Sequence, residues 1–197
     1  MVYTAKIKHW NDSYPIVAFI VKLMALFFLF DYFFLFLISA QAPGGDFYTP
    51  LIANHLNFVH WFEQFLLNSG GHFAMLFGYE YSIFGKKMIL NQGSGVILGF
   101  SCIGFSIMSF YLAFILAFPA TLKNKIIYGI GGLAVIISLN IMRIGGLAVI
   151  YSRLNYEEVR EVHHHAVFNA IVYIVIFIIF IFYTRNARLS KKNEPTS

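Results

Sequence analysis

Four long apolar runs divide the chain, and polar or charged residues bound each of them. The runs cover residues 15–40, 97–119, 126–150 and 165–183. A helix needs about 20 mostly apolar residues to cross a bilayer. We therefore predict an all-α integral membrane protein, with a single membrane domain over residues 1–197 built as a bundle of about four transmembrane helices. Residues 184–197 form a polar tail after the last span.

The segment 41–96, between the first two predicted spans, is too apolar for a plain linker. Within 51–67 the apolar residues recur at helical spacing, which predicts an amphipathic helix that lies either on the membrane surface or over the bundle. Further on, the short apolar stretches 81–84 and 88–90 flank a polar Gly85-Lys86-Lys87 turn. This pattern is typical of a short β-hairpin over 79–91.

Composition narrows the class of protein further. Hydrophobic residues make up 59% of the chain and charged residues only 12%, about half the charge of ordinary soluble domains. The single cysteine, Cys102, excludes an internal disulfide framework. The net charge of +5 is scattered outside the apolar runs, so we expect no nucleic-acid partner.

The charges also predict an orientation. With a cytoplasmic amino terminus, the inner segments hold eight Lys and Arg residues and the outer segments four. Positive charge is enriched on the cytoplasmic side of membrane proteins. We therefore predict a multi-pass protein of the cell (inner) membrane with both termini in the cytoplasm and segment 41–96 outside.

Polar side chains inside the predicted spans are candidates for a functional site, because they are costly in a membrane. Arg143 lies about 12 Å from the outer end of its span at about 1.5 Å per residue, and Asn140 precedes it by one helical turn. Asp31 lies at a similar depth, where an ion pair with Arg143 would hold the guanidinium in place. Cys102 lies near the outer end of the second span, and the triplet 163–165 places three histidines at the outer end of the fourth.

A thiol, an imidazole and a guanidinium on one side of the membrane can carry out acyl transfer. The imidazole takes the thiol proton and later returns it to a leaving amine, while the guanidinium stabilises an oxyanion. Taken alone, a cysteine in an apolar helix is more often inert packing. Consecutive histidines on a helix point about 100° apart and cannot all ligate one ion from one helix face, which argues against a metal site. We predict no metal and no cofactor.

The third span contains an exact repeat, Ile-Gly-Gly-Leu-Ala-Val-Ile, at 130–136 and 144–150. Fourteen residues separate the copies, close to four helical turns, so both glycine pairs lie near one stripe of the helix. We interpret this repeat as helix packing and not as a domain duplication.

At these residues the sequence resembles the exosortase and archaeosortase family of membrane-embedded cysteine proteases and transpeptidases. The resemblance rests on Cys-x-Gly at 102–104, Asn-x-x-Arg at 140–143 and the His165 that opens the last span, four residues before Asn169. It covers roughly residues 79–183, about half of the chain. Ile103 stands where many members of the family have a polar residue.

The resemblance implies that Cys102 is the nucleophile, Arg143 the transition-state stabiliser and His165 the general acid or base, with His164 the next candidate and His163 the least favoured. Asn140 and Asp31 are predicted supporting residues. The implied partners are membrane lipid and substrate proteins that end in a short recognition motif, a transmembrane helix and a basic cluster. The enzyme would cleave at the motif on the outer face through a thioester. A groove between the last three spans would admit the substrate helix, and we expect the glycine stripe at 131–132 and 145–146 to form a wall of it.

Two other readings of the same residues stay open. In the first, the chain is a non-catalytic multi-pass assembly or transport subunit, Arg143 and Asp31 form a structural pair, and Cys102 is packing. In the second, weaker reading, histidines bind a metal or a haem.

Overall fold

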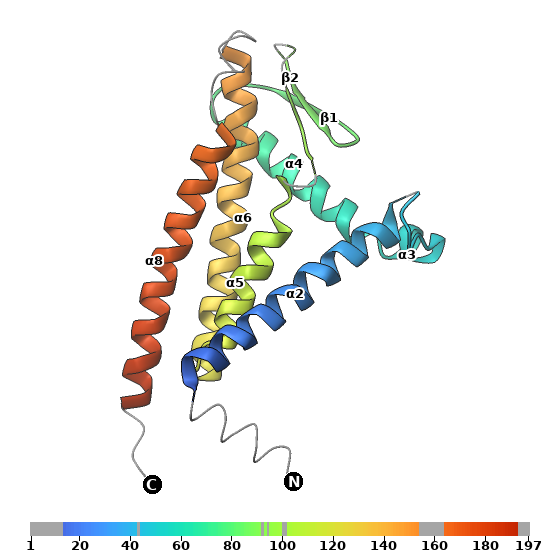
Figure 1. Ribbon diagram of the computed structural model, residues 1–197. Helices are drawn as coiled ribbons and strands as arrows, with labels where there is room; N and C mark the ends of the chain where they lie inside the picture. Colours follow the sequence, from blue (N-terminus) through green and yellow to red (C-terminus); the bar gives the residue numbers. More distant parts are fainter. Residues whose placement is uncertain are drawn as a thin grey trace.

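The computed structural model describes residues 14–42, 44–91, 93, 95–99, 102–153 and 164–192. Helices α2 (Pro15–Gln41), α5 (Phe105–Ala117), α6 (Leu122–Arg153) and α8 (His164–Lys192) make up a bundle. Helices α3 (Pro50–His55) and α4 (Phe58–Met75) and a small sheet lie between α2 and α5 in the sequence. Figure 1 shows the sheet at the end of the bundle that lies opposite the start of α2 and the end of α8.

Three helices of the described residues are long and apolar enough to cross a membrane, by length and composition. They are Pro15–Gln41, Leu122–Arg153 and Phe168–Leu189. These helices match three of the four predicted spans. The prediction of a mostly helical chain with membrane-length helices is confirmed at this level.

The prediction of a helix over 97–119 is wrong at its start. Ile97 ends a strand, and α5 begins only at Phe105. Gly104 precedes it with φ +85°, a left-handed conformation that side chains other than glycine rarely adopt. The 13 residues of α5 reach about 20 Å at 1.5 Å per residue, short of the roughly 30 Å of a bilayer core.

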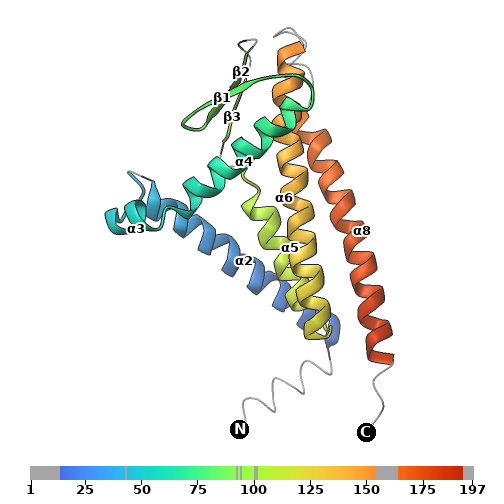
Figure 2. The same cartoon turned by 180° about the vertical axis from the view of Figure 1, so that it is seen from behind.

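Helix α5 lies between α2 and α6 in both views of the bundle (Figures 1 and 2). The ring of Phe105 stacks on Phe34 of α2 with 4.5 Å between centroids. The buried Tyr111 hydroxyl donates to the Tyr128 carbonyl of α6 at 2.6 Å, and the buried Tyr183 hydroxyl of α8 donates to the Ile115 carbonyl at 2.7 Å. Because buried hydroxyl groups need partners, these bonds fix how the three helices meet.

Glycines of α6 allow neighbouring helices to approach closely. Where α6 crosses α4, a Cβ atom at Gly145 would clash with the Gly70 carbonyl oxygen of α4. Where α6 meets α5, a Cβ atom at Gly132 would clash with the Tyr111 hydroxyl. By contrast, Gly131 and Gly146 face open space. The expectation that the stripe walls a substrate groove is therefore wrong at Gly145, where α4 already occupies the place.

The amphipathic helix predicted over 51–67 is two helices, α3 and α4. The break at 56–57 is stabilised by Asn57, whose side chain accepts a hydrogen bond from the His60 backbone N–H at 3.3 Å, as helix N-caps do. One face of α4 is buried over the bundle, while Phe58, Trp61 and Phe65 on its other face are about half exposed.

The sheet has three strands in the order β1 (Tyr81–Phe84), β2 (Lys87–Leu90) and β3 (Gly95–Ile97), and both pairings are antiparallel. The segment expected to form a hairpin contributes the first two strands. The Lys86 ammonium, in the turn between them, pairs with the buried Glu63 carboxylate of α4 at 2.8 Å.

A hydrogen bond joins the segment before the sheet to the end of α6. The Arg153 Nε donates to the Tyr79 hydroxyl at 3.1 Å. Hydrogen bonds with Ser152 and Arg153 lower the pKa of Tyr79 below its ordinary value, because both stabilise a phenolate.

We expect Gly145→Leu to lower the thermal unfolding midpoint of the detergent-solubilised protein, because the added side chain must displace the α4 backbone. Overpacking of this kind costs about 1–3 kcal/mol. Gly146→Leu is the matched control, since the neighbouring position faces open space, and it should leave the midpoint unchanged. Equal midpoints for both variants would contradict the close α4–α6 crossing.

Candidate functional site

Cys102 lies in a turn between β3 and α5, and not inside a membrane helix as the sequence suggested. Its backbone N–H donates to the Gly99 carbonyl at 2.9 Å. The thiol is half-buried, and Ile103, the next residue, is buried in the core. The turn leads through the left-handed Gly104 into α5, so the thiol precedes the amino-terminal end of that helix.

Asn140 holds this turn against α6. Its side-chain amide nitrogen donates to the Cys102 carbonyl at 2.8 Å and to the Ile103 carbonyl at 3.1 Å. The residue is buried, with 6% of its surface exposed. A single amide group therefore satisfies two carbonyls of the turn and fixes the cysteine backbone relative to α6.

Arg143 lies one helical turn after Asn140, and its side chain also extends to the turn that contains Cys102. Its Nη2 is 4.0 Å from the Cys102 sulfur, and its guanidinium carbon lies 5.0 Å from the centre of the Phe168 ring of α8. Only 9% of the residue is exposed. A guanidinium near a sulfur stabilises negative charge that develops there, and burial strengthens the effect.

The predicted histidines are at the start of α8. His164 and His165 occupy its first turn, and their side chains lie outside the described part of the structure. His163 also lies outside the described residues. Phe168, one turn after His165, contacts Arg143, so the first two turns of α8 pass the guanidinium.

Asp31 contacts α5 and not Arg143. Its carboxylate accepts a hydrogen bond from the Ser106 hydroxyl at 2.7 Å. The ion pairs of the described residues do not include one between Asp31 and Arg143. Because α2 runs along α5, Asp31 lies at the first turn of that helix.

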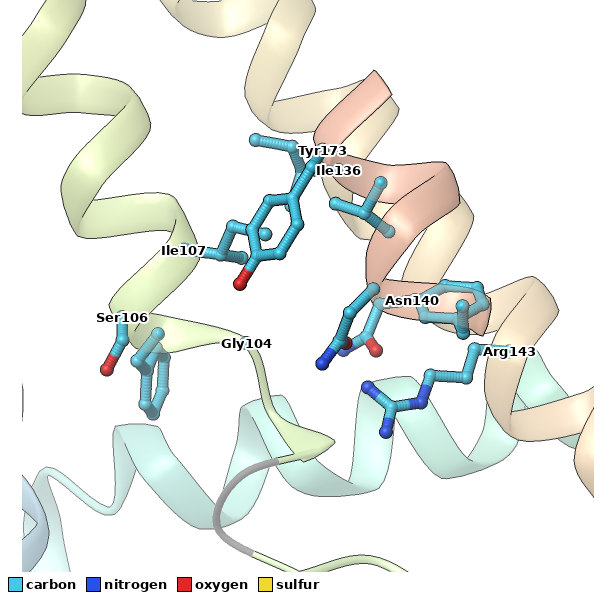
Figure 3. Close-up of a pocket in the computed structure, with 11 residues that line it drawn as sticks. Gly104, Ser106, Ile107, Ile136, Asn140, Arg143 and Tyr173 are labelled. Atoms are coloured by element: carbon cyan, nitrogen blue, oxygen red, sulfur yellow. The ribbon is translucent and has the colours of Figure 1, made fainter. Parts of the chain in front are cut away.

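Two cavities of about 280 Å³ each meet at Arg143. The first, which we call the helix cavity, lies between α5, α6 and α8. Figure 3 shows Asn140 and Arg143 extending from α6 toward Gly104, with Tyr173 entering from another side. The second, the strand cavity, lies between β3 and α6 and is lined by residues 95–98, Cys102, Arg143, Ile144, Leu147 and Tyr151.

Sequence reasoning missed the residues that complete both cavities. Phe168 and Tyr173 are aromatic residues in a helix full of them, and nothing in the spacing marks these two. The backbone of β3 was hidden because residues 95–97 were assigned to the end of a loop and the start of a helix. Tyr151 lies just past the predicted third span, where tyrosine is common at membrane interfaces.

Among the residues that the structure describes, no group of three His, Cys, Asp or Glu side chains lies close enough together to hold a metal ion. The side chains of 163–165 are outside that set. The chemistry available from the described residues is therefore that of a thiol beside a buried guanidinium.

Comparison with known proteins adds no further constraint. No protein-family model, no curated protein and no solved structure matches the chain.

We expect Asn140→Ala to loosen the turn, because it leaves two carbonyls without their donor. A buried polar group without a partner costs about 1–3 kcal/mol. The thermal unfolding midpoint should fall, and alkylation of Cys102 by iodoacetamide should change in rate.

Ser138→Ala on the same helix is the control, since the exposed Ser138 hydroxyl donates to the Ala134 carbonyl one turn away and takes no part in the contact with the turn. It should match the wild type in both measurements. If Asn140→Ala also matches the wild type, the amide does not fix the turn.

Proposed function

We propose that this protein is a membrane-embedded cysteine endopeptidase or transpeptidase that cleaves C-terminal sorting signals of exported proteins. One observation carries the proposal. The only thiol of the chain and a buried guanidinium lie 4.0 Å apart across 41 residues of sequence, and both line the strand cavity. An isolated packing cysteine has no need of such a neighbour.

The membrane setting is part of the proposal. Three apolar helices support a membrane protein, and the excess of Lys and Arg in the segments that include both termini supports a cytoplasmic location for those ends. In that orientation, in the cell (inner) membrane, the turn of Cys102 lies near the outer face. A site there meets substrates after their export.

The reaction begins when the His165 imidazole takes the proton of the Cys102 thiol. The sulfur then adds to the scissile carbonyl carbon, and the Arg143 guanidinium stabilises the oxyanion that forms. The carbon–nitrogen bond breaks, the imidazolium gives its proton to the leaving amine, and the acyl group stays on the sulfur as a thioester. Water or a second amine then attacks the thioester carbon and loses a proton to His165. The carbon–sulfur bond breaks, and the Cys102 thiolate that leaves takes this proton back from the imidazolium.

The supporting residues have separate parts in this scheme. Asn140 positions the nucleophile through its two bonds to the turn. Asp31 acts at a distance, since its bond to Ser106 joins α2 to the first turn of α5. Neither residue exchanges a proton with the substrate.

The proposed substrates are proteins that end in a short motif, an apolar helix and a Lys- and Arg-rich cluster. The apolar helix would bring the motif to the membrane surface and hold it at the depth of the turn. No metal or other cofactor takes part in the proposed reaction.

The test compares the wild type with Cys102→Ala and Cys102→Ser, each co-expressed with exported proteins of the same cell that carry such a C-terminal tag. The wild type should remove the tag, and both variants should leave it in place, because a serine hydroxyl is a far weaker nucleophile than a thiolate. Immunoblots of the tagged proteins provide the measurement.

The control is Ser138→Ala, on the exposed side of α6 away from the turn, which should process the tag at the wild-type rate. Continued removal of the tag by both cysteine variants would contradict the proposal. That result would favour a non-catalytic assembly or transport subunit in which Cys102 is packing.

A further inference from the structure

The third strand of the sheet has a free edge. β3 pairs with β2 on one side, in the register Lys87 with Ile97 and Met88 with Val96. Among the described strands none pairs with its other side. An edge of unpaired backbone groups can accept another extended chain.

The register identifies which groups point to the free side. The Leu98 N–H donates to the Lys86 carbonyl at 2.8 Å, so Leu98 faces β2. Backbone groups alternate between the two edges of an antiparallel strand. The N–H and carbonyl of Ile97 therefore point away from β2. The side chains also alternate, with Val96 and Leu98 buried and Ile97 69% exposed.

This strand borders the cavity that contains the nucleophile. Residues 95–98 line the strand cavity together with Cys102 and Arg143. The wall that faces them is α6, with Ile144, Leu147 and Tyr151. In Figure 2, β3 runs toward the start of α5, and the turn of Cys102 lies between them in sequence. A chain laid along β3 thus ends beside the thiol.

We propose that the substrate binds as an added β-strand along the free edge of β3, which delivers its scissile carbonyl to the Cys102 sulfur. This inference rests on the proposed function and names how that site holds a peptide. The affinity comes from two main-chain hydrogen bonds, one that the Ile97 N–H donates to the substrate and one that the Ile97 carbonyl accepts from it. Every second side chain of the substrate faces the apolar wall of α6, which selects small or apolar residues at alternate positions.

This mode of binding suits a scissile bond in an irregular segment. A peptide bond inside a helix has its N–H and carbonyl engaged within the helix, whereas an extended segment leaves them for the enzyme. The sorting motif must therefore be extended where it meets the site, and the transmembrane helix of the substrate begins beyond it.

The test uses a disulfide probe in place of the unidentified substrate. The probe is an acetylated Val-Thr-Val-Cys amide whose cysteine carries a 2-thiopyridyl group. The Cys102 thiolate attacks the probe's cysteine sulfur, a mixed disulfide forms, and pyridine-2-thiolate leaves. Its release is followed by absorbance, with the full-length protein in detergent.

Two N-methylated versions of the probe carry the methyl groups on alternate backbone amides. An added strand uses only every second amide, so one methylated probe should react about tenfold more slowly than the parent, as expected for the loss of about 1.4 kcal/mol of hydrogen bonding. The other should react like the parent. Ile97→Pro, which removes an edge N–H that β2 does not use, should slow the parent probe about tenfold for the same reason, whereas Ile97→Ala should react like the wild type.

A small reagent, 2,2′-dipyridyl disulfide, separates the two proposals. Equal rates for all three peptides, with normal reaction of the small reagent, would overturn the added strand and leave the thiol chemistry standing. If Cys102 reacts with neither the small reagent nor the peptides, the proposed function falls and the inference falls with it. The comparison of the methylated probes on the wild-type protein tests the added strand even if Ile97→Pro fails to fold.

Discussion

The two hydrogen bonds from Asn140 to the Cys102 and Ile103 carbonyls are the constraint on which the site depends. A buried amide and two backbone carbonyls would each be costly without partners. The amide and the two carbonyls can bond to one another only when the turn packs against α6 at the level of Asn140. The position of the thiol is therefore set by α6, although the thiol belongs to the strand-to-helix connection.

The rest of the architecture supports that contact. α6 packs on α4 through the Gly70–Gly145 crossing and receives the Tyr111 hydroxyl of α5. Arg143 then reaches the thiol from α6 one turn beyond Asn140, and the ring of Phe168 covers its guanidinium from α8. Two cavities remain on either side of Arg143 because α5 is short and the chain approaches it as a strand instead of a helix.

Much of this fold follows from the pattern of apolar residues. α2, α6 and α8 were predictable because runs of about 20 or more apolar residues are typical of membrane spans. The run from Ile97 was not, since a continuous apolar stretch carries no period that distinguishes a strand from a helix. The break between α3 and α4 was missed because Asn57 acts through a local cap, while the residues around it keep helical spacing.

The site was predictable in part. Polar residues inside apolar runs pointed to Asn140, Arg143 and Cys102, and the structure brings these three together. The partner of Asp31 was not predictable, because similar depth along two helices does not determine which helices are neighbours. The buried Glu63 of α4 pairs with Lys86 of the β1–β2 turn, whose side chain is largely exposed, and the sequence patterns did not predict this pair. Long-range packing decides such pairs, and a single sequence does not contain it.

The most direct test of the central claim is to identify the covalent intermediate. Wild-type protein turning over a tagged substrate would be quenched in acid and digested, and the peptide that contains Cys102 would be examined by mass spectrometry. The account predicts a substrate fragment on the Cys102 sulfur that hydroxylamine removes, as expected for a thioester. Cleavage of the substrate with no adduct on Cys102 at any time of quenching would contradict it.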